Sequence, residues 1–134
     1  MPSIPRPDEI VARARALVGT RFRPQGRTVA DGLDCIGLVA LAVDARNVPR
    51  DYALRGAPAA RLRAGLRAAG LRTAGPGAVD DMAAGDVLVL EPGPGQLHLG
   101  LFTGTGLIHG DAAARRVVER PLPLPWPVRG IWRY

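Results

Sequence analysis

Three side chains in this sequence have the chemistry needed for acyl transfer: one cysteine and two histidines. The chain has a single cysteine, Cys35, and its two histidines are His98 and His109. A thiolate is a strong nucleophile, and a nearby imidazole can take the thiol proton and later return it to the leaving group. We therefore predict that Cys35 is the nucleophile, that His98 is the general base, and that His109 orients His98 through a hydrogen bond.

Each of these residues also has a purely structural explanation. A lone cysteine on an apolar helix face usually packs in the core, and a lone histidine in a strand usually has a structural hydrogen bond. Cysteine and histidine are also common zinc ligands. The sequence lacks the closely spaced pairs of structural zinc sites, so we predict no metal and no other cofactor.

The residues around Cys35 predict a helix that begins near Asp34. Apolar residues repeat with helical spacing at Cys35, Leu38, Val39, Ala42 and Val43. Asp34 has a side chain typical of a helix N-cap. The positive end of the helix is expected to lower the pKa of the Cys35 thiol from about 8.5. Backbone amides in the first turn could stabilise an oxyanion.

The two histidines flank a predicted β-hairpin. Leu97, Leu99 and Leu101 alternate as in a half-buried strand, so the side chain of His98 points to the opposite face. The sequence Thr103-Gly104-Thr105-Gly106 is typical of a hairpin turn.

The length of the hairpin loop decides whether the histidines meet. With an even number of loop residues, His98 pairs with Asp111, and His109 is its diagonal neighbour on the same face. An odd loop without a compensating bulge puts the histidines on opposite faces. The even loop therefore predicts a base beside its orienting residue, with Asp111 as a second candidate for that orienting role.

The remaining pattern places helices first and strands second. Helices are expected at 7–18, from about Asp34, and at 58–69, with loops at 20–33, 46–57 and 73–84. Strands are expected at 86–90, 97–101, 107–109, 117–119 and 128–134. This order indicates one α+β domain, residues 1–134, with an antiparallel sheet. The proline-rich stretch around Trp126 is interpreted as a connector between strands rather than a polyproline ligand.

The composition favours acidic partners without indicating nucleic acid. All 18 basic residues are arginine, and with 12 acidic residues they give a net charge of +6. The arginines alternate with alanine and leucine and are not accompanied by aromatic residues that could stack on bases, so we expect no nucleic-acid partner. The sequence has no apolar run of membrane-spanning or signal-peptide type, so we expect no membrane insertion and synthesis in the cytoplasm without a secretory signal.

Several short motifs resemble those of the NlpC-type cell-wall cysteine peptidases. The run Asp34-Cys35-Ile36-Gly37-Leu38-Val39 resembles the family signature Asp-Cys-Ser-Gly-Leu-Val. Other blocks resemble family motifs in the same order: Val18-Gly19-Thr20-Arg21-Phe22, Gly85-Asp86-Val87-Leu88, His98-Leu99-Gly100-Leu101-Phe102 and Ile108-His109-Gly110. The resemblance runs from about Ile10 to about His109.

The resemblance implies a papain-like NlpC-type fold, in which N-terminal helices pack on a small antiparallel sheet. It implies a catalytic triad of Cys35, His98 and His109 without a metal, and hydrolysis of amide bonds in peptidoglycan stem peptides, often between D-glutamate and a diamino acid. Ile36 after the nucleophile, with no signal or wall-binding repeat in the sequence, is most similar to members encoded with phage tails or gene transfer agents. We therefore expect a location in a virion-like tail, with tail-tip or hub proteins as partners.

Two positions depart from the family pattern. The family tyrosine is Phe22, which lacks the hydroxyl, and the family serine after the nucleophile is Ile36. The resemblance assigns Phe22 and Asp34 to substrate binding, with Asp34 near the amine end of the peptide. The departures leave an alternative open: a catalytically weak or inactive structural component of a tail assembly with the same fold.

Overall fold

The computed structural model describes residues 5–45, 59–75 and 79–134. Its helices are α1 (Pro7–Ala16), α2 (Cys35–Ala42) and α3 (Ala59–Ala68), and a short 3₁₀ helix, η1, lies at Val79–Asp81. The predicted helices are confirmed, each with slightly different ends. The loop predicted at 46–57 lies outside the described residues.

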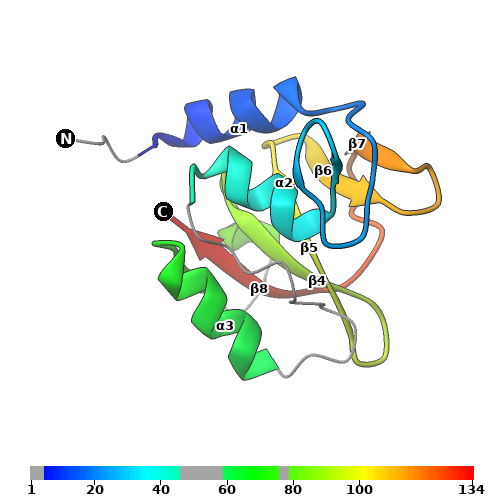
Figure 1. Ribbon diagram of the computed structural model, residues 1–134. Helices are drawn as coiled ribbons and strands as arrows, with labels where there is room; N and C mark the ends of the chain where they lie inside the picture. The colour runs from blue at the N-terminus through cyan, green and yellow to red at the C-terminus, as the bar shows by residue number, and fades with distance from the viewer. Residues whose placement is uncertain (1–4, 46–58, 76–78) are drawn as a thin grey trace.

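An antiparallel sheet forms the rest of the described fold (Figure 1). Its strands, in spatial order, are β3 (Arg72–Gly75), β8 (Val128–Arg133), β4 (Val87–Gly93), β5 (Gln96–Phe102), β6 (Gly106–Asp111) and β7 (Arg116–Pro121). Each strand is antiparallel to its neighbours. The prediction of helices with an antiparallel sheet is confirmed.

Two segments predicted as loops contain short strands, and in those places the prediction was wrong. At the start of 73–84, Thr73 pairs with Trp132 of β8. Within 20–33, β1 (Arg27–Thr28) pairs with β2 (Gly32–Leu33). Neither segment has the alternating β-branched residues of a typical strand. Pairing with a neighbour, rather than local propensity, makes both segments extended.

Each face of the main sheet carries an apolar cluster, because successive strand residues point to opposite faces. The helices share one cluster with the sheet, whose buried members include Ile10, Leu38, Leu66, Val87, Leu99 and Ile108. In Figure 1, α2 lies in front of the sheet, with α1 and α3 on either side of it. The opposite cluster contains Leu88, Leu90, Phe102, Leu107 and Ile131. Leu124 and Trp126 pack against it, so the proline-rich stretch is a connector between β7 and β8 that covers this face.

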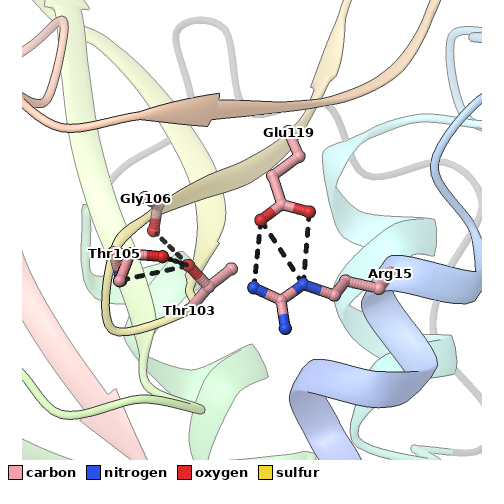
Figure 2. Close-up of polar contacts among 5 residues, drawn as sticks. All are labelled: Arg15, Thr103, Thr105, Gly106 and Glu119. Carbon is pink, nitrogen blue, oxygen red and sulfur yellow. Dashed lines mark hydrogen bonds and ion pairs between the residues drawn. The ribbon is translucent and has the colours of Figure 1, made fainter.

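The end of α1 is fastened to β7 at the edge of the sheet. The Arg15 guanidinium donates hydrogen bonds of 3.2 to 3.4 Å to the Glu119 carboxylate (Figure 2). Both side chains are partly exposed, so the pair contributes at most about 1 kcal/mol to stability. Backbone hydrogen bonds of 2.8 Å from Gly19 to Val117 and from Val117 to Thr20 close the same edge. The loop before α2 therefore starts from a fixed position on the sheet.

Candidate active site

The helix that carries Cys35 begins where the preceding loop folds over it. The Asp34 carboxylate accepts a hydrogen bond of 2.8 Å from the Gly37 amide, which confirms Asp34 as the N-cap. A Cβ atom at Gly37 would overlap the carbonyl oxygen of Gly26, so glycine is required for this close approach. The Cys35 side chain is buried, with a relative exposure of 8%.

The hairpin that carries the histidines has the register expected for an even loop. Leu101 pairs with Ile108, and Phe102 pairs with Leu107. The Thr103 hydroxyl donates to the Gly106 carbonyl at 3.3 Å (Figure 2). The Thr103 amide donates to the same carbonyl at 2.9 Å. Gly104 has a φ of +97°, a conformation that glycine adopts without strain.

This register brings the two histidine side chains together. Nε2 of His98 lies 3.0 Å from Nδ1 of His109, which is hydrogen-bond distance. The Asp111 carboxylate instead accepts hydrogen bonds from the Ala113 and Ala114 amides at 2.9 and 3.2 Å. The prediction that both histidines share a face is confirmed, and His109 rather than Asp111 is the hydrogen-bond partner of His98.

The Cys35 thiol lies against the backbone of β5. It accepts a hydrogen bond from the Leu99 amide, and the hydrogen bonds among described residues include none from the thiol to either histidine. Cys35 and Leu99 belong to the helix-side cluster, whereas His98 pairs with Leu90 of the opposite cluster. The thiol therefore lies at the His98-Leu99 peptide, next to the residue that carries the imidazole.

Burial sets the protonation state of these groups. Desolvation, and then the Asp34 carboxylate, raise the pKa of the Cys35 thiol to about 12. The expected lowering of this pKa by the helix start is therefore wrong, because removal from water outweighs the favourable contributions of neighbouring amides. Desolvation, and then His109, lower the pKa of His98 to about 4, and desolvation also lowers the pKa of His109. At neutral pH the thiol and both imidazoles are uncharged.

Asp34 and Phe22, the predicted substrate-binding residues, both border the start of α2. Arg27 Nη1 donates to the Asp34 carboxylate at 2.8 Å, and the Gln25 amide donates to it at 3.1 Å. The Phe22 ring lies beside Gly110, where an added Cβ would be 3.3 Å from the ring and 3.4 Å from the Cys35 nitrogen. The loop, β6 and the helix start thus meet around the thiol. The substrate-binding roles of Asp34 and Phe22 stay predictions.

Two residues at the site were not predicted to belong to it. The Trp126 ring centroid lies 5.4 Å from that of His98 and 5.2 Å from that of His109. Trp126 was a recognisable signal, because only 4% of the residues are aromatic. Nothing in the sequence distinguishes Arg27 from the other arginines. Arg27 also borders an open pocket of about 260 Å³ beside the loop, lined by Arg23, Pro24, Gln25, Gly26, Arg27 and Asp31.

The described residues include no group of three or more His, Cys, Asp or Glu side chains arranged to hold a metal ion. The zinc alternative therefore has no ligand set in this part of the chain. Within the same residues, no helix has both the length and the apolar character needed to span a bilayer.

Comparison with known proteins finds similarity at the level of the fold. No protein-family model and no curated protein sequence matches the chain. Among solved structures, an NlpC/P60 family protein from Bacillus cereus is similar with a TM-score of 0.67 and 22% identity, over 98% of this chain and 41% of that one. NlpC1 from Trichomonas vaginalis gives a TM-score of 0.67 and 18% identity, over 96% of this chain and 45% of that one.

A third similar structure has nearly the same extent as this chain. It is the NlpC/p60 domain of the peptidoglycan hydrolase SagA, with a TM-score of 0.65 and 21% identity, over 96% of this chain and 99% of that domain. The chain spans less than half the length of the Bacillus cereus and Trichomonas vaginalis proteins. The papain-like NlpC/P60 fold predicted from the motifs is therefore confirmed.

Proposed function

We propose that the chain is a cysteine peptidase that hydrolyses amide bonds in peptidoglycan stem peptides. The observation that carries the proposal is the hydrogen bond between His98 of β5 and His109 of β6, beside the Leu99 amide of β5 that contacts the only thiol of the chain. The likeness to NlpC/P60 domains, one of which belongs to a peptidoglycan hydrolase, supports the substrate class. The order of the motifs in the sequence supports the same roles for Cys35, His98 and His109.

The geometry suggests a reaction that starts from uncharged groups. A rotation of the Cys35 side chain away from the Leu99 amide would bring the thiol toward His98, and such contacts commonly tighten only when substrate is bound. As the sulfur attacks the amide carbon, its proton passes to the uncharged His98 imidazole. His98 then protonates the leaving amine, and water hydrolyses the thioester to complete the cycle.

The oxyanion formed in the first step needs hydrogen-bond donors. The first amides of a helix have no partners within the helix, and at α2 the Gly37 amide is already bound by Asp34. The Cys35 amide, which lies against its own thiol, is the donor best placed to stabilise the oxyanion. The scheme requires the tautomer in which Nε2 of His98 donates to His109, because Nδ1 of His98 is then the proton acceptor.

Transport to the wall on a phage tail or gene-transfer particle is the finer part of the proposal. Its support is the resemblance of the motif with Ile36 to tail-encoded members of the family. A net charge of +6 is compatible with a wall polymer that carries carboxylates. Detection of the chain by mass spectrometry in purified tail-like particles would support this part, and its absence from the particles would contradict it.

Digestion of purified peptidoglycan tests the activity itself. Sacculi incubated with the protein are expected to release peptides whose masses and new termini identify the cleaved amide bond. Cys35→Ala should abolish release while its circular dichroism spectrum and melting temperature stay close to those of the unmodified chain. Failure of the unmodified chain to release any peptide from sacculi of several wall types would contradict the proposal.

A second function is favoured by one specific observation. The Cys35 thiol has a raised pKa and a hydrogen bond to Leu99. Both features fit a structural cysteine packed in the core as well as they fit a nucleophile before substrate binds. A structural component of a tail with this fold would have the same features. In that case Cys35→Ser would leave particle infectivity or gene transfer unchanged, whereas a peptidase would lose it.

A further inference from the structure

Trp126, from the connector between β7 and β8, forms a cluster of three rings with the histidine pair. Its ring planes make angles of 89° with His98 and 87° with His109, at centroid distances of 5.4 and 5.2 Å. The two imidazoles are themselves 5.2 Å apart at 89°. Each ring therefore meets the other two edge to face, the arrangement that aromatic rings prefer.

The surroundings of this cluster keep water away from one histidine. His109 has a relative exposure of only 1%, and its Nε2 atom is buried without a hydrogen-bond partner. Trp126 is itself half-buried and packs against the apolar cluster on this face of the sheet. The apolar cluster thus supports one side of the indole, while the indole ring contacts both imidazoles.

The hydrogen bond between the histidines depends on this enclosure. A neutral imidazole has one N–H donor and one acceptor nitrogen, so in the tautomer in which Nε2 of His98 donates to Nδ1 of His109, Nδ1 of His98 is unprotonated. Water admitted to the pair would compete for the same atoms and let both rings turn. His98 would then present the correct nitrogen to the thiol in only a fraction of molecules.

We infer that Trp126 is a positioning residue of the active site, which fixes the orientation of His98 and His109 and keeps water from their hydrogen bond. The inference rests on the proposed function in so far as it assigns the pair a catalytic role. The part of the inference that concerns structure, that the indole fixes the two imidazole rings, does not depend on peptidase activity. Trp126 does not act on the substrate itself.

Histidine titration followed by NMR tests this content directly. In the unmodified chain both imidazoles should stay uncharged down to acidic pH. Trp126→Leu should shift the midpoint of the His98 titration upward by about one pH unit or more, because water reaches the pair. Asp111 and Arg120, the charged groups that act on the two histidines, are unchanged in this variant.

Kinetics on a stem peptide provides the second readout. Trp126→Leu is expected to lower kcat by about 10- to 100-fold with little change in KM, because the base is misplaced rather than the substrate. Trp126→Phe, which keeps an aromatic ring, should restore most of kcat and the low histidine midpoint. Trp132→Phe is the matched control, because Trp132 is buried in the helix-side cluster away from the histidines.

The outcomes separate the two proposals. An unmodified chain without peptidase activity contradicts the proposed function, and the NMR titration still decides the role of Trp126. Unchanged histidine midpoints in Trp126→Leu would overturn the inference. A shift of the same size in Trp132→Phe would overturn it as well, since any loss of core packing would then suffice. If Trp126→Leu does not fold, Trp126→Met takes its place: a raised His98 midpoint supports the inference, and an unchanged midpoint contradicts it.

Discussion

Arg27 and Asp34 form an ion pair of 2.8 Å beside Cys35, with side chains that are only 7% and 13% exposed. The carboxylate also accepts hydrogen bonds from the Gln25 and Gly37 amides. One side chain therefore caps α2, binds the loop before it and neutralises a buried arginine. The Asp34 carboxylate is thus paired with a cation from the protein itself and has a structural role at the start of α2.

Replacement of Asp34 by alanine is expected to destabilise the fold. Loss of the helix cap alone costs about 0.5 to 2 kcal/mol, and loss of the buried ion pair adds to it. Asp34→Asn keeps an acceptor for the Gly37 amide and should cost less. Urea unfolding followed by circular dichroism measures the free energy of unfolding in each variant.

The same loop provides the control for this prediction. Asp31 is exposed, and its carboxylate accepts a hydrogen bond of 3.0 Å from the Thr28 hydroxyl. Asp31→Ala should therefore change the free energy of unfolding by less than Asp34→Asn does. If Asp34→Ala and Asp31→Ala had the same free energy of unfolding, the ion pair and the helix cap would not stabilise the fold.

Alkylation of Cys35 is expected to be slow at neutral pH and to accelerate through the alkaline range. A thiol pKa of about 12 leaves little thiolate at pH 7, and below the pKa the thiolate fraction rises about tenfold per pH unit. The rate with iodoacetamide should rise from pH 7 to pH 10 without a plateau. Glutathione treated in parallel should level off above its own pKa. A plateau for the protein below pH 7 would show a preformed thiolate, contrary to this structure.

The lowered pKa of His98 predicts a specific dependence of stability on pH. The folded-state value of about 4 lies below the ordinary 6.5, so between these values the unfolded chain binds a proton that the folded chain does not. Stability is therefore expected to fall as the pH drops from 6.5 to 4, by up to about 1.4 kcal/mol per pH unit for this group. His98→Gln should flatten the dependence in this window. An equally steep dependence in His98→Gln would assign it to other groups.

The sequence predicted the parts of the site that depend on local pattern. An even number of residues in the turn after Phe102 was enough to predict that His98 lies beside His109. Side chains alternate regularly between the two faces of such short strands. The cap at Asp34 followed from residue type. The thiol pKa did not follow, because it depends on how deeply the folded chain buries Cys35. Trp126 reaches the histidines only through the packing of a connector that is distant in sequence, which no local pattern specifies.

Gly37 and Gly65 test whether the loop over α2 depends on close backbone packing. Both lie within helices, where alanine normally stabilises by about 0.5 to 1 kcal/mol. A Cβ at Gly65 meets nothing within 4 Å, whereas one at Gly37 overlaps the carbonyl of Gly26. Gly65→Ala should therefore raise the free energy of unfolding, and Gly37→Ala should lower it by about 1 to 3 kcal/mol. Because the loop must shift away from the helix start, Gly37→Ala should also expose the thiol and accelerate its alkylation. Equal stabilisation by both substitutions would mean that the loop does not lie against the first turn in solution.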